Sequence, residues 1–233
     1  MNKIKNWVHE EFIAGYTPFD YFFMGIMVLA QIIVFMICPD NWLNIVAGLS
    51  GVISVVLCAK CKISFYFIGF IQNFSYIVLA YQNKFYGEVA EQIFYIATMI
   101  WGIFVWKKNS VKEDNGDKHV VAKTFNLTKW LIAGGLTAVA TIALGSGLVT
   151  IGSAQAYKDA FTNIAAIIAQ LLMVWGYREQ WVWWLAIDVV CTVMWALVGN
   201  WSMVAMYIAW TINCIYGWYQ WTKTAKEGVA CES

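Results

Sequence analysis

A single carboxylate lies among four tryptophans in the apolar stretch formed by residues 181–195, WVWWLAIDVVCTVMW. If this stretch is helical, its spacings of 3, 4, 3 and 4 place five residues on one face: Trp181, Trp184, Asp188, Cys191 and Trp195. Only this face of the predicted helix carries a charge. The pattern is therefore typical of the wall of a small-molecule pore.

Neutral hydrogen-bonding side chains in other apolar stretches could complete a binding pocket. They are Gln72, Asn73, Gln92, Tyr95, Tyr207, Asn213 and Tyr216. Each of these amides and hydroxyls could instead hold two helices together, which is a frequent role of such groups in membrane bundles. Taken together with Trp181, Trp184 and Asp188, they predict a substrate site for a polyhydroxylated, aromatic ligand.

The elements that would position these residues are long apolar helices. Hydrophobic residues make up 61% of the chain and charged residues only 12%, whereas soluble proteins average about 25% charged residues. Eight apolar stretches are long enough to cross about 30 Å of hydrocarbon: 19–38, 43–59, 63–81, 90–106, 130–150, 160–176, 181–198 and 202–221. The sequence predicts an all-α integral membrane protein with eight transmembrane helices in a lipid bilayer. The segment before them carries Trp7, Phe12 and Ile13 among charges, which suits anchoring at the membrane interface.

Asp188 would then lie about 10 Å along its helix from the interface near Trp181. A carboxylate at that depth costs free energy unless it faces a cavity or a partner, so it is a functional candidate. The alternative is a protonated Asp188 that only forms a hydrogen bond with a neighbouring helix.

The basic residues are distributed unequally between the two ends of the predicted helices. Of the fifteen, thirteen fall on one side: Lys3, Lys5, Lys60, Lys62, Lys107, Lys108, Lys112, Lys118, Lys123, Lys129, Arg178, Lys223 and Lys226. Only Lys84 and Lys158 fall on the other side. Because positive charge is enriched in cytoplasmic loops, both termini are expected to be cytoplasmic.

An internal repeat relates the two halves of the chain. Residues 44–47 (NIVA) resemble 163–166 (NIAA) at an offset of 119, and Asn73 matches Asp188 at an offset of 115. Four further pairs share the second offset: Thr98 with Asn213, Trp101 with Tyr216, Gly102 with Gly217, and Trp106 with Trp221. The difference of four residues is expected before the middle helix of each half.

Repeats of three spans that share one orientation need a linking span between them. The predicted arrangement is 1+3+1+3, in six segments: 1–41 with the extra helix, 42–107 as repeat 1, 108–129 as a flexible cytoplasmic loop, 130–150 as the linker helix, 151–223 as repeat 2, and 224–233 as a cytoplasmic tail. Parallel repeats of this kind resemble the architecture of SWEET sugar transporters, where substrate sits near the membrane midplane.

Several other chemistries are excluded by the residues. His9 and His119 are the only histidines and lie outside the spans, so a bis-histidine haem site is not expected. The sequence has no Walker, metal-ligand or catalytic-triad pattern. We therefore expect no catalytic residue, no metal, no cofactor and no nucleic-acid partner, and the protein is not expected to be an enzyme.

The run from Arg178 to Trp181, followed by Trp184 and Asp188, resembles the PnuC family of bacterial vitamin transporters. The family pattern is W-x-x-W-x-x-x-N with an aromatic residue seven positions later, and Asp188 stands where the family has Asn. Further matches are Tyr86-Gly87-Glu88, Trp101-Gly102 with Trp106, Asn213 with Tyr216-Gly217-Trp218, and Trp221. The resemblance covers about residues 42–223.

This resemblance implies facilitated diffusion (uniport) of nicotinamide riboside across the bacterial inner membrane, with trapping by a cytoplasmic kinase. Relatives carry thiamine, riboflavin or deoxynucleosides. Nicotinamide riboside and thiamine both contain a cationic ring that suits Trp184 and Asp188, which leaves thiamine as the second candidate substrate. Proton-coupled uptake through Asp188 and a membrane sensor or assembly factor without flux are the alternatives of other classes, and a homo-oligomer is left open.

Overall fold

The computed structural model describes residues 2–37, 41–82, 84, 86–112, 116–153, 155–199 and 201–232. Within these residues it is helical apart from one two-stranded hairpin. The chain divides into two compact units, Met1–Val121 and Ala122–Ser233.

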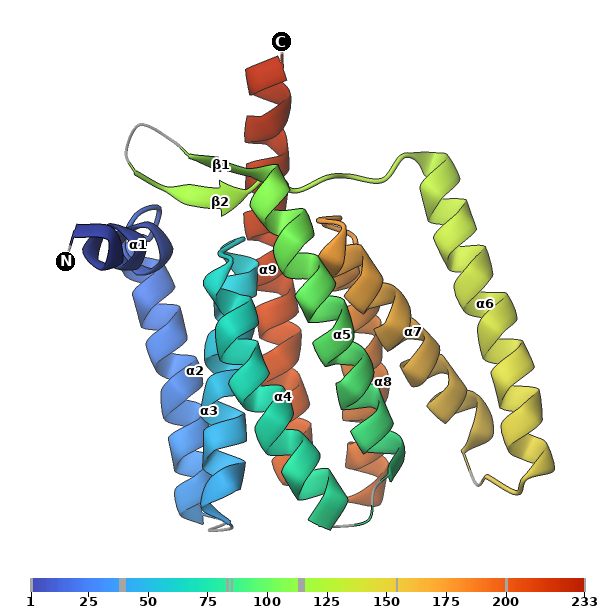
Figure 1. Ribbon diagram of the computed structural model, residues 1–233. Helices are drawn as coiled ribbons and strands as arrows, with labels where there is room; N and C mark the ends of the chain where they lie inside the picture. The colour runs from blue at the N-terminus through green and yellow to red at the C-terminus, as the bar shows by residue number, and fades with distance from the viewer. Residues whose placement is uncertain are drawn as a thin grey trace. The chain divides into compact units, whose positions relative to one another are not determined.

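The described residues of the first unit form five helices and the hairpin. Its elements, which Figure 1 labels, are α1 Asn2–Phe12, α2 Pro18–Ile37, α3 Trp42–Ala59, α4 Ser64–Gln82, α5 Tyr86–Asn109, β1 Ser110–Lys112 and β2 Lys118–Val120. Helix α3 packs against α2 and α4, and α4 packs against α5. The strands pair antiparallel, with Val111 opposite His119.

The described residues of the second unit form four helices. They are α6 Leu127–Thr150, α7 Ala156–Val174, α8 Gln180–Val198 and α9 Trp201–Glu232. Helix α7 packs against α6 and α8, and α8 packs against α9. Helix α9 continues beyond residue 223, where a separate cytoplasmic tail was expected.

Each of the eight predicted spans coincides with a helix of the structure. In the described part of the chain, five helices are long and apolar enough to cross a membrane: α2, α3, α4, Glu88–Asn109 of α5, and α6. Helix α6 exposes large apolar side chains such as Leu131, Ile132 and Val139, as expected where a helix contacts lipid. The protein is thus a multi-pass membrane protein.

Helices α3 and α7 end in the same backbone motif. The motif places Cys61 in the first unit and Gly176 in the second in the left-handed region, with φ of 56° and 75°. The Lys62 amide then donates to the Leu57 carbonyl (3.1 Å), as the Tyr177 amide donates to Leu172 (2.8 Å). All three pairs are 115 residues apart, so this offset already holds at the end of the first helix of each half. The expected offset of 119 there was therefore wrong, because short apolar runs match at several registers.

An aromatic ring lies over a glycine at the same place in each unit. In the first unit, the Tyr66 ring occupies the space that a Cβ at Gly102 would fill, and it meets Trp106 edge-on with ring centroids 5.3 Å apart. The second unit repeats this contact. The Trp181 ring occupies the space that a Cβ at Gly217 would fill, and it meets Trp221 edge-on with ring centroids 6.0 Å apart. The missing side chain lets the two helices approach closely.

The loop expected to be flexible carries the β1–β2 hairpin and is hydrogen-bonded to other parts of the first unit. Its β2 strand is tied to the end of α3 by the Val120 amide, which donates to the Cys61 carbonyl (3.0 Å). The Lys62 ammonium, only 1% exposed, donates to Asp117 and to the carbonyls of Glu10 (2.8 Å) and Ala14 (3.1 Å). A buried ammonium requires such acceptors. The bonds of Lys62 therefore hold Asp117 in place, although the composition of the loop 108–129 suggested that it is solvated.

The hydrogen bonds around Asp117 and Glu11 bind the N-terminal segment to the unit. Burial raises the pKa of Asp117, but hydrogen bonds from His119 and Lys62 outweigh it and hold the pKa below its usual value. The buried Glu11 carboxylate accepts from the Ser64 amide (2.8 Å), which caps the start of α4. Helix α1 is therefore fastened by its acidic residues, while Trp7 stays exposed, as expected of an interfacial helix.

We predict that Gly102→Ala and Gly217→Ala each destabilise the protein by about 1–3 kcal/mol, because the new Cβ would overlap a buried ring. Gly134→Ala is the matched control: it lies on the exposed face of α6 with nothing within 4 Å, so only the better helix propensity of alanine should act. Thermal unfolding of the purified variants in detergent measures the difference. Equal melting of all three variants would contradict the close contact.

Candidate functional site

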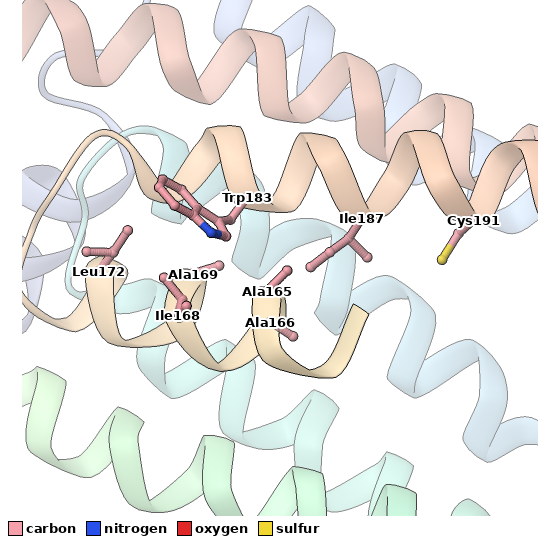
Figure 2. Close-up of a cluster of buried hydrophobic side chains, with 8 residues drawn as sticks. All are labelled: Ala165, Ala166, Ile168, Ala169, Leu172, Trp183, Ile187 and Cys191. Atoms are coloured by element: carbon pink, nitrogen blue, oxygen red, sulfur yellow. The ribbon is translucent and has the colours of Figure 1, made fainter. Parts of the chain in front are cut away.

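The tryptophan-rich stretch forms helix α8, and its predicted single face is shared between two neighbours. Trp183, Ile187 and Cys191 point toward Ala165, Ala169 and Leu172 of α7, as Figure 2 shows. Trp184 is partly buried at the edge of the same cluster. Trp181 and Asp188 instead contact α9. The side chain of Trp195 lies outside the described residues.

Trp183 and Trp184 are neighbours in sequence but differ in their surroundings. The Trp183 indole N–H donates to the Thr137 hydroxyl of α6 (2.9 Å), and its ring stacks on Trp130 with centroids 5.5 Å apart. A buried indole N–H normally requires such a partner. Trp183 therefore fastens α8 to α6, a role that the sequence pattern did not reveal.

Asp188 is buried between α8 and α9. Its side chain is 4% exposed, and its Oδ2 accepts a hydrogen bond from the Cys214 thiol at 3.3 Å. Asn213, the residue before Cys214, is also buried, and its Oδ1 has no hydrogen-bond partner among the described residues. The second unit thus brings a carboxylate and an amide with unused hydrogen-bonding capacity onto facing helices.

Asn73 has the equivalent environment in the first unit. It is 4% exposed, and its amide donates to the Gly69 carbonyl (2.8 Å) and to the Met99 sulfur (3.2 Å). Met99 and Cys214 are 115 residues apart, as are Asn73 and Asp188. In each unit, a polar side chain of the middle helix therefore meets a sulfur of the following helix.

The remaining predicted residues of the first unit lie on α4 and α5. Gln92 is buried, with an Oε1 that lacks a partner within the described part of the chain. The Tyr95 hydroxyl donates to Glu91 (2.7 Å), and Gln72 lies half-buried beside Gly51.

Two carboxylates on α5 were missed by the sequence reasoning. Glu91 bonds to Tyr95, and Glu88 accepts from the Tyr76 hydroxyl of α4 (3.3 Å). Glu91 lies inside the predicted span 90–106, and a carboxylate within a span was the signal that could have identified it. These two pairs place hydrogen-bonded acidic groups beside Gln92.

The predicted aromatic residues of the second unit occupy distinct places. The Trp181 ring packs on Gly217 and Trp221. Its indole N–H has no hydrogen-bond partner among the described residues. Tyr207 packs against the α7–α8 cluster and hydrogen-bonds with Cys191. Tyr216 is buried on α9.

Comparisons with known proteins agree with the sequence resemblance. The family model described as nicotinamide mononucleotide transporter matches residues 41–223. A relative named nicotinamide riboside transporter PnuC, from Haemophilus influenzae, is 34% identical over 93% of this chain and 95% of its own length. Proteins of the same name from Neisseria mucosa and Escherichia coli are 31% and 24% identical, over 94% and 80% of this chain and 87% of each relative.

A solved structure supports the same assignment. The crystal structure titled "Vitamin B3 transporter PnuC" matches with a TM-score of 0.81 and 31% identity, over 95% of this chain and 97% of that one. These relatives are named as transporters and not as enzymes, in line with the sequence-based expectation. The chain belongs to the PnuC family of membrane transporters.

Proposed function

We propose that this protein carries nicotinamide riboside across the bacterial inner membrane into the cytoplasm by facilitated diffusion. The observation that carries this proposal is the buried Asp188 carboxylate, four residues from Trp184 on α8 of a chain whose relatives are named nicotinamide riboside transporters. The pyridinium ring of the substrate is cationic and flat. It is suited both to a tryptophan face and to a nearby carboxylate.

The charge of Asp188 also distinguishes a nucleoside from a nucleotide. The matching family model is described by the mononucleotide, whereas the relatives are named for the riboside. A phosphate brought near a buried carboxylate would be repelled, because like charges interact strongly where water is excluded. The site chemistry therefore favours the riboside. Thiamine shares the cationic ring and is the second candidate substrate.

Ten residues are proposed to bind substrate. In the first unit they are Gln72, Asn73, Gln92 and Tyr95, and in the second unit they are Trp181, Trp184, Asp188, Tyr207, Asn213 and Tyr216. The side-chain carbonyl oxygens of Gln92 and Asn213 have no hydrogen-bond partner among the described residues, and they suit donors such as ribose hydroxyls or a carboxamide. Trp181 is the member whose ring is most engaged in helix packing.

The proposed architecture is the 1+3+1+3 arrangement of eight membrane helices, similar to SWEET transporters, with both termini cytoplasmic. The contacts repeated at an offset of 115 support two three-helix repeats, α3–α5 and α7–α9, with α2 as the extra helix and α6 as the linker. Repeats in the same orientation place substrate near the midplane. The uneven distribution of basic residues supports the orientation.

Facilitated diffusion needs a sink if it is to supply the cell. Phosphorylation by a cytoplasmic kinase would supply it, because the added charge prevents return. Proton coupling through Asp188 is the competing mechanism, and the presence of Glu91 as a second carboxylate within a predicted span makes it worth testing.

We predict that the purified protein in liposomes equilibrates nicotinamide riboside without concentrating it, because no ion gradient drives a uniporter. Uptake of labelled substrate is measured with and without imposed proton and sodium gradients, and protein-free liposomes give the background. Accumulation of unmodified substrate above the outside level would contradict uniport. Absence of any flux would favour a sensor or assembly factor.

Trp184→Ala is predicted to weaken binding tenfold or more, because cation–π attraction alone contributes about 2 kcal/mol in a desolvated site. Trp184→Phe should recover part of the affinity. Trp183→Phe is the matched control, since it removes the indole bond to Thr137 and should lower the melting temperature more than the affinity. Calorimetric titration with nicotinamide riboside measures affinity. Equal losses in Trp183→Phe and Trp184→Phe would argue against Trp184 as the stacking residue.

Asp188→Asn is predicted to keep binding but to reduce the preference for the cationic riboside over its neutral reduced form roughly five- to tenfold. The amide preserves size and hydrogen bonding and removes only the charge. Titration of both ligands into wild type and variant gives the ratio. An identical ratio in the two proteins would mean that Asp188 does not sense the charge of the ligand.

A further inference from the structure

Each unit has an equivalent hydrogen bond that involves sulfur, but the sulfur is the acceptor in the first unit and the donor in the second. In the first unit the Asn73 amide is the donor and the Met99 thioether accepts, at 3.2 Å. In the second unit the Cys214 thiol is the donor and the Asp188 carboxylate accepts, at 3.3 Å. An ionised carboxylate has no hydrogen to give, and a thioether has none either, so a methionine could not serve beside Asp188. The thiol supplies the donor that this position requires.

The two units also differ in which of the two helices carries the larger side chain at this level. In the first unit the Met99 methyl group lies 2.6 Å from the point where a Cβ on Gly69 would stand, so methionine fills the space above a glycine. At the offset of 115, Gly69 corresponds to Trp184 and Met99 corresponds to Cys214. The second unit therefore pairs a large residue on the middle helix with a small one on the following helix. The small residue at 214 retains a hydrogen-bond donor, which an alanine of similar size would lack.

The bond between Cys214 and Asp188 is shielded from solvent. Both side chains are 4–5% exposed. In such surroundings a hydrogen bond is electrostatically stronger than in water, and it restricts rotation of the carboxylate about its side-chain torsions. The direction in which the negative charge is presented thus depends on the thiol.

We propose that Cys214 is a positioning residue, whose thiol holds the Asp188 carboxylate in the orientation that meets the cationic ring of the substrate. Cys214 then contributes to the preference for cationic over neutral ligands without contacting the ring. This inference rests on the proposed function, because it requires Asp188 to sense the charge of the ligand. It assigns charge selectivity to the second unit, since the equivalent pair Asn73 and Met99 carries no charge.

Together with Asp188→Asn, four further variants test the inference by a double-mutant cycle. Cys214→Ala and Cys214→Val remove the donor, Cys214→Ser keeps a donor of similar size, and Cys214→Ala is repeated in the Asp188→Asn background. The affinities for nicotinamide riboside and for its neutral reduced form are measured by calorimetry on purified full-length protein, with thermal unfolding as the check on folding. Cys214→Val provides the donor-free protein if Cys214→Ala does not fold.

The donor-free variants are expected to lower the cationic-to-neutral affinity ratio about threefold, the scale of one hydrogen bond. Cys214→Ser should retain the wild-type ratio, and Cys214→Ala should leave the ratio unchanged in the Asp188→Asn background because no carboxylate remains to be oriented. A wild-type ratio in the donor-free variants would overturn the inference. So would an equal loss of affinity for both ligands, or a ratio lowered as much in Cys214→Ser, since each indicates packing alone.

The same measurements separate this inference from the proposed function. If wild type binds neither ligand, the assignment of the substrate fails. If wild type binds both and Asp188→Asn leaves their ratio unchanged, the role of Asp188 fails, and the inference about Cys214 is overturned with it. If Asp188→Asn lowers the ratio and the donor-free Cys214 variants do not, only the inference about Cys214 is overturned.

Discussion

A carboxylate inside an apolar helix bundle costs free energy unless it faces a cavity or a hydrogen-bond donor. Asp188 satisfies this requirement through Cys214, and its position on α8 brings it close along the helix to Trp184. Burial of the Asp188 carboxylate costs free energy unless a donor faces it, so helix α9 needs a hydrogen-bond donor at position 214. The chemistry proposed for the site follows from the same constraint, because a charge that is costly to bury attracts an opposite charge strongly.

The two units satisfy a second constraint identically. Each brings a middle helix and the following helix into close contact by seating an aromatic ring over a glycine, Tyr66 over Gly102 and Trp181 over Gly217. Each ends its preceding helix with a left-handed residue in the same hydrogen-bonding pattern. Against this shared framework, the exchange of asparagine and methionine for aspartate and cysteine is a change of chemistry within a preserved packing arrangement. The same packing arrangement can therefore carry different chemistry in each unit.

Buried charge also organises the part of the first unit that lies outside the spans. The Lys62 ammonium pairs with Asp117 and donates to carbonyl groups at the end of α1. The Glu11 carboxylate caps α4. These bonds join three segments that are distant in sequence. They provide a fixed end to the helices that carry Asn73 and Gln92, which a solvated loop could not do.

The sequence by itself determined the class of protein, the places of its helices and the family. Apolar length and the low charge content predicted eight apolar stretches, and the structure has a helix at each of these places, because burial in hydrocarbon leaves a strong pattern in composition. It also singled out Asp188, since a carboxylate within such a stretch is rare. Only the tertiary structure decided that Trp183 holds α6 while Trp184 does not, that Glu91 has a tyrosine partner, and that a cysteine donates to Asp188. Those distinctions depend on which residues of other helices stand opposite, and helical periodicity fixes a direction around one axis without naming the neighbour found there.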